Sequence, residues 1–304
     1  MGVKRFTVNR YSNERFTVPV AAGGVPPTLT MNVLIIAGGG AGGPSIGAGG
    51  GAGGVLEGTL IVSLPYTSTV SIGAGAATGA EGTNGSDTVC FGVTAIGGGG
   101  ARSWTTTNGA NAGNAGGSGG GGAGNRGGTT AGGAATQTSQ GGLTGYGNSG
   151  GIGKSSGDPI QPAGGGGAGG VGQDGINTGT TKAGNGGIGI YSEITGTNTG
   201  YAGGASGHSY NTAANPDDTR DIWGGGVSLD NIKTNGVANK GGGGAGGGFI
   251  YGPNQGAGGS GVVIVRYLGA QKATGGTVTT YSALGLTYTV HTFNSSSTFD
   301  AAAP

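Results

Sequence analysis

The sequence MNVLIIAGGGAGGPSIGAGGGAGG, residues 31–54, decides how this chain can fold. Its apolar run at 33–36 passes without a turn residue into a glycine tract at 38–43. A short break, Pro44-Ser45-Ile46, separates this tract from a second one at 47–54, and another strand-like run follows at 59–64. The chain therefore alternates β-type segments with glycine tracts, and this pattern recurs as far as residue 261.

Composition narrows the class of protein. Glycine accounts for 84 of the 304 residues, about four times its usual share of roughly 7%. Charged residues make up only 8% of the chain and the net charge is +1, whereas disordered chains combine high net charge with low hydrophobicity. A nucleic-acid partner is not expected, because the chain lacks the excess of basic residues that would neutralise phosphates.

The cysteine count and the apolar runs exclude further classes. The single cysteine, Cys90, permits no disulfide within the chain and no cysteine-based zinc site. No apolar run approaches the roughly 18 residues that span a bilayer, and residues 1–16 lack the apolar core of a secretory signal. We therefore expect neither membrane insertion nor Sec-type export, so that an extracellular place would be reached by host lysis or by a signal-independent route.

Strands are expected where β-branched and aromatic residues cluster between the glycine tracts. The segment at 5–20 predicts a β-hairpin or two short strands. Further strands are predicted at 28–37, at 55–72 with a break at 64–66, at 87–96, at 261–267, and as two or three short strands within 277–299. No segment shows the periodicity of an α-helix.

Three structures compete for the glycine tracts. A flexible linker is the default for glycine-rich sequence, but here strands bound the tracts directly, as in GGGFIY at 246–251. Collagen needs glycine at every third position and much proline, whereas the chain has 10 prolines and no such period. The third structure is favoured: extended left-handed helices of polyproline II geometry, called polyglycine II helices, that pair their amide groups with neighbouring helices.

The order of these segments resembles a known family. VLIIAGGGAGG at 33–43, GAGGGAGGVLEG at 47–58, ITGTNTGYAGG at 194–204 and GGGGAGGGFIYGPNQGAGGSGVVIVRY at 241–267 are similar to the glycine-rich domain of bacteriophage tail-fibre and related virion proteins. The tail at 269–299 resembles the closing segment of phage structural proteins, notably those of cyanophages. The glycine pattern also resembles the ectodomain of certain animal receptor kinases, although no kinase follows.

The resemblance implies a fold and a function. It implies a mainly β protein, with essentially no α-helix, in which antiparallel left-handed polyglycine II helices form a sandwich beside short strands. In the T-even type of adhesin, loops at the end of that sandwich bind host receptors. This chain departs from those adhesins at its N-terminus, where no fibre-docking domain is recognisable.

Two motifs suggest nucleotide binding but lack their structural context. The glycines at 38, 40 and 43 follow a strand, as in a dinucleotide fingerprint. That site needs a helix next to hold the pyrophosphate, and here Pro44 and another glycine tract follow. GIGKSS at 151–156 resembles the end of a Walker A motif, but Asn148 stands where the pattern asks for glycine, and Lys154 is expected in a solvated loop.

The sequence also shows no pattern of residues that is typical of a hydrolytic site or a metal site. His208 and His291 are the only histidines, too few for a multi-histidine metal site. His208 precedes the aspartates Asp217, Asp218 and Asp221, which we interpret as a polar loop, and His291 is expected to be a cross-strand partner. Cys90 is interpreted as a small core residue. We therefore predict no enzyme activity, no cofactor and no metal.

Polar and aromatic inserts between the tracts are the remaining candidates for function. If the tracts run as rods, the inserts gather at the two ends of the bundle, where aromatic, Asp and Arg side chains suit recognition of a saccharide or a protein. Capping of the bundle ends or contact between subunits stays open as the alternative. The candidate receptor-binding residues are Trp104, Tyr146, Tyr201, His208, Tyr210, Asp217, Asp218, Arg220, Trp223, Phe249 and Tyr251.

Three regions and two functions are predicted. Residues 1–30 form an N-terminal β-hairpin or attachment segment, 31–268 the glycine-rich β and polyglycine II domain, and 269–304 a C-terminal β segment. This last segment packs on its own chain or completes the sheet of a neighbouring subunit by strand addition. The first function is a homo-oligomeric virion structural protein of the tail-fibre or adhesin type that binds a host-surface saccharide or protein. The second is a purely structural subunit of a capsid or tail decoration or an extracellular filament.

Overall fold

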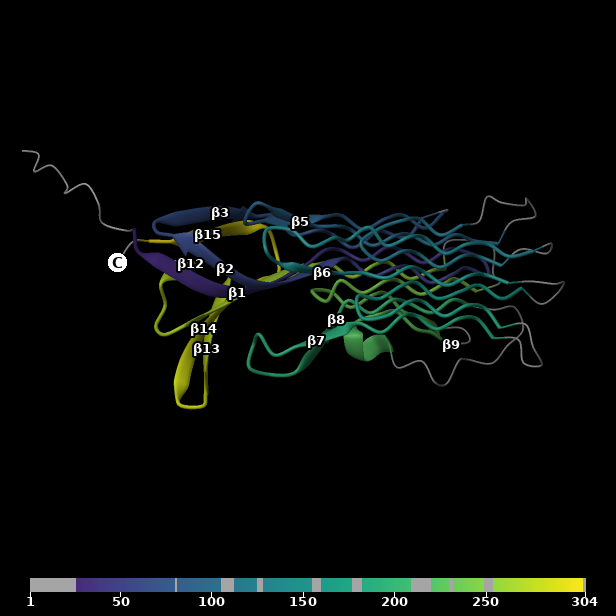
Figure 1. Cartoon of the computed structure of the whole chain (residues 1–304). Helices are drawn as coiled ribbons and strands as arrows, with labels where there is room; N and C mark the ends of the chain where they lie inside the picture. Colours follow the sequence, from purple (N-terminus) through teal and green to yellow (C-terminus); the bar gives the residue numbers. More distant parts are fainter. Residues whose placement is uncertain are drawn as a thin grey trace, which may run out of the picture.

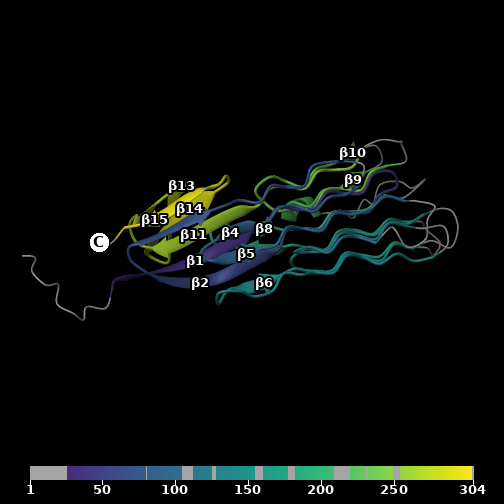
Figure 2. The same ribbon diagram turned by 90° about the horizontal axis from the view of Figure 1, so that it is seen from above.

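The computed structural model describes residues 26–79, 81–104, 112–124, 128–154, 160–176, 182–208, 220–229, 232–248 and 254–302. The β-hairpin predicted at 5–20 lies outside these residues. In Figure 1 the larger β-strands gather at one end of the molecule, and the glycine-rich segments run side by side from them toward the other end. Figure 2 shows the same two-part arrangement from above.

A six-stranded antiparallel sheet forms the base of the molecule. Its order is β13-β14-β11-β1-β2-β6, and its strands are β1 (Thr28–Ile36), β2 (Val55–Ser63), β6 (Thr144–Tyr146), β11 (Val262–Leu268), β13 (Thr277–Ala283) and β14 (Leu286–Phe293). The strands predicted at 28–37 and 261–267 are thereby confirmed as β1 and β11, which pair with each other at the centre. The break predicted at 64–66 separates β2 from β3 (Tyr66–Val70).

The first core lies between this sheet and a smaller one. The smaller sheet has the order β12-β15-β3, with β12 at Ala273–Thr274 and β15 at Ser297–Ala301. Val33 and Ile35 of β1 face this core together with Phe299 of β15, and all three are fully buried. Alternation along β1 sends Leu34 and Ile36 to a second core on the opposite face. The strand is thus buried on both faces because each face of the sheet is covered.

The segment 87–96, predicted as one strand, is a two-stranded hairpin. It consists of β4 (Thr88–Cys90) and β5 (Val93–Ala95), which pair antiparallel. The turn falls at Phe91 and Gly92, whose φ angles are +52° and +74°. Two successive residues with positive φ make the tight turn that suits the twist of a hairpin, and the apolar residues on both sides concealed this turn in the sequence. Cys90 is buried in the first core, which confirms its interpretation as a core residue.

A second hairpin covers the other face of the large sheet. It is formed by β7 (Ile190–Ser192) and β8 (Thr199–Tyr201). Ile194 and Tyr201 from this region pack with Leu34 and Ile264 in the second core. The described residues hold no α-helix, only the short 3-10 helix η1 (Arg220–Trp223), and none of their helices is long and apolar enough to cross a membrane.

The hydrogen bonds of the glycine tracts repeat every third residue. In the segment 47–54, the N–H groups of Gly47, Gly50 and Gly53 donate to carbonyls in 241–247. The N–H groups of Ala48, Gly51 and Gly54 donate to 96–102 in the same way, and those of Gly49 and Ala52 donate to 163–166. A period of three is that of a polyproline II-type helix. Within 47–54 no residue has a positive φ, in agreement with the left-handed form.

The carbonyl groups of the same segment face three other neighbours. They accept N–H groups from 37–43, from 118–121 and from 205–208. The segment 47–54 is therefore surrounded by six others, each of them joined to it through backbone amides. Five of them run antiparallel to it, whereas 163–166 runs parallel, since Gly49 and Ala52 donate in ascending order to Ala163 and Gly166. Bonds that lie across the helix axis form with a neighbour of either direction, so this one parallel neighbour fits into surroundings that are otherwise antiparallel, as expected.

Glycine is required in these tracts by the close approach of the backbones. A Cβ atom on Gly50 would overlap with the carbonyl oxygen of Gly40, and one on Gly49 would overlap with that of Ala205. Alanine occurs at interior positions such as Ala41, Ala48 and Ala52, where the methyl group is fully buried. The tracts thus form a second, almost side-chain-free core that is held by amide pairing.

The C-terminal segment belongs to the same sheets as the glycine-rich part. β14 pairs with β11, and β15 pairs with β3. Within this single chain, both strands therefore pair with strands of the chain itself. The boundary expected at 268/269 therefore does not separate two cores, because Phe293 and Phe299 lie in one core with β1.

Candidate binding surfaces

The end of the bundle that lies away from the large sheet is built around the turn 44–46, and we call it the distal end. Ser45 and Ile46 have positive φ angles of 31° and 47°. The N–H of Ile46 donates to the carbonyl of Gly248 at 3.0 Å, and the N–H of Trp104 donates to that of Ser45 at 3.3 Å. Three stretches far apart in the sequence therefore meet here, and the candidate residue Trp104 is among them.

His208 joins the distal end through both its backbone and its ring. Its N–H donates to the carbonyl of Gly47 at 2.9 Å, and its Nδ1 lies 2.9 Å from the hydroxyl of Ser228. Ser228 begins β9 (Ser228–Leu229), which pairs with β10 (Ile232–Lys233). Figure 2 shows both strands in the bundle, away from the large sheet, and Figure 1 shows β9 there. The candidate residues Trp104 and His208 thus share one end of the molecule.

An ion pair lies at a similar level of the bundle. Lys154 Nζ is 2.9 Å from Asp174 Oδ2, and both side chains are about two-fifths exposed. Burial acts to raise the pKa of Asp174, but the N–H of Ile152 and the ammonium of Lys154 outweigh it and hold that pKa below its ordinary value. The backbone of Lys154 pairs with Gln161, two residues before Ala163, the partner of Gly49. Lys154 is therefore half-exposed at the distal end, and it forms an ion pair there.

Three other candidate residues lie elsewhere. Tyr146 belongs to β6 and pairs with Val55 at the edge of the large sheet. Tyr201 is only 6% exposed and contributes to the second core. The ring of Trp223 lies 5.5 Å from that of Tyr191, beside the β7–β8 hairpin. The structure thus divides the candidates between two parts of the molecule, and Tyr201 is placed where a surface ligand does not reach it.

The remaining candidates fall on parts of the chain that are not described, or have no described side chain. Tyr210, Asp217, Asp218, Phe249 and Tyr251 lie outside the described residues. Arg220 begins η1, and its side chain is not described. Within the part of the chain that is described, no group of three His, Cys, Asp or Glu side chains is arranged to hold a metal ion.

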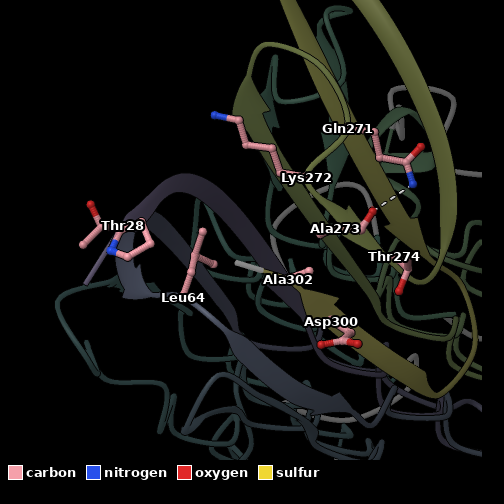
Figure 3. Close-up of a pocket in the computed structure, with 9 residues that line it drawn as sticks. Thr28, Leu64, Gln271, Lys272, Ala273, Thr274, Asp300 and Ala302 are labelled. Carbon is pink, nitrogen blue, oxygen red and sulfur yellow. Dashed lines mark hydrogen bonds between the residues drawn. The ribbon is translucent and has the colours of Figure 1, made fainter. Parts of the chain in front are cut away.

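A hollow of about 740 Å³ opens at the opposite end of the molecule. Figure 3 shows Thr28 and Leu64 on one side of it, with Lys272 and Asp300 among the residues across from them. The side chain of Gln271 donates to the carbonyl of Ala273 at 2.8 Å and borders the hollow. No pattern in the sequence indicates this hollow, because its lining residues come from four separate stretches and carry no motif.

A smaller cleft of about 250 Å³ lies on the second face of the large sheet. It is lined by polar side chains of β1, β2 and β11 and by the segment that follows β7. The sequence pattern did not mark these residues as a site either, because each of them looks like an ordinary strand residue when the sequence is considered alone.

Comparison with family models identifies the family of this chain. The family model described as "Glycine-rich domain" matches residues 15–268. The chain belongs to this family. Neither the comparison with curated proteins nor the comparison with solved structures found a match. The match to the glycine-rich domain covers the whole described bundle and β11, and it ends where the C-terminal strands begin.

Proposed function

We propose that this glycine-rich domain protein is a non-enzymatic virion structural protein of the phage tail-fibre or adhesin type. In this proposal the bundle is a rigid support, and the distal end binds a saccharide or protein on the host surface. The observation that carries the proposal is the convergence of Trp104, the turn 44–46 and His208 at one end of a bundle whose interior backbone is paired in six directions. Rigid scaffolds that position surface loops are a common arrangement for recognition.

The chemistry of the reactive side chains supports a non-enzymatic role. Cys90 is buried, and burial raises the pKa of its thiol to about 12. His291 is fully buried and uses both ring nitrogens in hydrogen bonds to Tyr267 and Gly275. Neither group is thus placed to act as a nucleophile or as a base toward a bound substrate. In this proposal the protein acts in the virion and reaches the extracellular space after host lysis.

The proposal is tested by attachment to cells. Fluorescently labelled protein is mixed with a panel of bacteria that includes cyanobacteria, and bound label is counted by flow cytometry. The double variant Trp104→Ala/Lys154→Ala removes an aromatic and a cationic side chain from the distal end. The matched control is Tyr191→Ala, which removes an exposed aromatic ring beside the sheets.

We expect the double variant to bind roughly tenfold more weakly to the cells that bind the wild type and the Tyr191→Ala control. This corresponds to a loss of about 1.4 kcal/mol of binding free energy. Thermal unfolding of all three proteins checks that the fold is retained. Equal binding of the double variant, with its fold intact, contradicts a role for the distal end.

A second candidate is a self-assembling subunit of a capsid or tail decoration or of an extracellular filament. The observation that favours it is the edge strand β13, whose residues are mostly exposed and whose outer side has no partner strand within the described chain. Such an edge is a site for strand addition from another copy. Filaments in negative-stain images, together with no attachment to any cell tested, support this candidate over the first.

A further inference from the structure

The polar cleft on the second face of the large sheet is organised as one row of side chains. Thr59, Asn32 and Arg266 are direct neighbours across β2, β1 and β11. The Asn32 side-chain amide donates to Thr59 Oγ1 at 2.9 Å, and its oxygen accepts from Arg266 Nη2 at 3.0 Å. The same face is apolar toward the bundle, at Leu34 and Ile36, so the row marks the point where the sheet surface becomes polar.

Arg266 is held in place by several groups, but none of the described residues gives it a carboxylate partner. Its Nη1 donates to the Tyr281 hydroxyl at 2.9 Å and to the Glu193 carbonyl at 3.3 Å. Its guanidinium carbon lies 5.3 Å from the centroid of the Tyr288 ring, and this ring stacks on Tyr281 at 5.2 Å. The two tyrosines are positioning residues for a cation that forms no ion pair with any other described residue.

A loop from the β7–β8 hairpin closes one side of the cleft. Ser192 Oγ donates to Glu57 Oε1 at 2.8 Å, which ties this loop to β2. Gly196 has a φ of +85°, and a Cβ there would meet the Tyr281 ring at 2.7 Å, so the loop lies directly against that ring. The other oxygen of Glu57 accepts no hydrogen bond from the described residues, and it adds an acceptor to the cleft.

The free groups define the chemistry of the ligand. Of the five N–H donors of an arginine, three of those of Arg266 are used and a fourth, on Nε, is buried, which leaves one on Nη2. Thr59 offers its hydroxyl hydrogen and Glu57 offers an oxygen. Donors and an acceptor side by side match adjacent sugar hydroxyls, each of which both donates and accepts. The Glu57 carboxylate disfavours a phosphate or another anion.

We propose that this cleft binds one neutral pyranose unit of a glycan. Its volume of about 250 Å³ is below the roughly 300–1,000 Å³ of pockets for drug-sized ligands, and it therefore takes a single small ring. The site lies on the sheet and does not depend on the distal end or on attachment to cells. Failure of the proposed function therefore leaves this inference standing, and the reverse is also true.

The test uses saturation-transfer difference NMR on the full chain. The probes are the methyl pyranosides of glucose, galactose, mannose and N-acetylglucosamine, each offered separately. We expect at least one of them to bind with a dissociation constant of about 1 mM, near −4 kcal/mol. Glu57→Gln keeps an oxygen for Ser192 but removes the charged acceptor. We expect it to weaken this binding by roughly tenfold, because a hydrogen bond to a charged group is stronger than one to a neutral group.

Two further variants keep the test decisive. Thr59→Val removes a hydroxyl at an exposed position, and we expect it to weaken binding as well, so that the inference is still tested if Glu57→Gln does not fold. Lys154→Ala, at the distal end, is the control that retains binding. The proposal is overturned if none of the four probes binds, or if both cleft variants bind as the wild type does.

Discussion

The hydroxyl of Tyr267 and Nε2 of His291 lie 2.9 Å apart in the core between the two sheets. His291 Nδ1 lies 2.8 Å from the carbonyl of Gly275, and because a carbonyl only accepts, the ring proton is on Nδ1. Nε2 therefore accepts from Tyr267, whose oxygen in turn accepts from the N–H groups of Lys272 and Ala273. This chain of bonds fixes a neutral imidazole and joins β11, β12 and β14.

The first prediction is a loss of stability in acid. Burial lowers the pKa of His291 from its ordinary value of 6.5, outweighing the hydrogen bond to Gly275, which acts to raise it. The unfolded chain therefore takes up a proton more readily than the folded one as the pH falls below about 6.5. We expect the free energy of unfolding, measured by urea titration, to be highest above that pH and to decrease below it.

Replacement of each histidine separates this effect from other titrations. His291→Gln removes the titrating group, and we expect it to flatten the pH dependence below about 6.5 while lowering stability at neutral pH. His208→Gln is the matched comparison, because it removes the other histidine and leaves the Tyr267–His291 pair in place. An unchanged slope in His291→Gln would place the acid sensitivity elsewhere.

The second prediction concerns the packing of backbone on backbone. Gly50→Ala introduces a methyl group that overlaps with the carbonyl of Gly40, and neither backbone can move without breaking its own amide pairs. We expect a loss of at least roughly 1–3 kcal/mol, the usual range for an overpacked core. Gly128→Ala, where a Cβ meets no atom within 4 Å and φ is not positive, serves as the matched control and should leave the melting temperature unchanged.

The third prediction concerns hydrogen exchange in the tracts. Because the N–H groups of 47–54 all donate to carbonyls within the bundle, their exchange requires opening of several segments together. We expect these glycine amides to be protected to a degree that approaches global unfolding, as measured by exchange into deuterated water. Narrow random-coil glycine signals that exchange freely would show that the tracts are linkers and would remove the support from the proposed function.

The fourth prediction concerns the single thiol. Burial raises the pKa of Cys90 to about 12, so at pH 8 almost no thiolate is present in the folded protein. Since the thiolate is the reactive form, we expect a thiol-specific reagent to modify Cys90 only after denaturant is added. Rapid modification of the native protein, at the rate seen in urea, would mean that the β4–β5 hairpin opens readily.

The fifth prediction concerns the C-terminal strands. Deletion of residues 277–304 removes Phe293 and Phe299, each at most 1% exposed. It also takes β14 from one side of β11, which keeps β1 on the other side, and it removes β15, the partner of β3. We expect the truncated chain to be insoluble or to lack cooperative unfolding. A truncated chain that melts cooperatively and differs only in its assembly state would instead favour exchange of these strands between subunits.

The sequence determined the local structure of this protein well where composition leaves few alternatives. An apolar run such as 33–36 has to be buried, and a tract without side chains can gain stability only through its amides. The strands, the amide pairing of the glycine tracts and the lack of α-helix in the described residues were therefore predictable. The confirmed strands β1 and β11 and the buried Cys90 belong to this class. The hairpin at 88–95 was missed because its turn depends on positive φ angles at Phe91 and Gly92, between apolar residues that read as one strand.

Only the tertiary structure decided which segments became neighbours. Glycine tracts carry no side chains that could specify a partner, and 47–54 therefore gave no sign that 163–166 lies parallel to it or that 205–208 completes its surroundings. The positions of the candidate residues depend on these neighbours and could not be predicted either. Trp104 and His208 share the distal end, whereas Tyr201 is buried in the second core. The polar cleft likewise exists only because β1, β2 and β11 align Thr59, Asn32 and Arg266 across the sheet, a relationship set by strand register and not by distance along the chain.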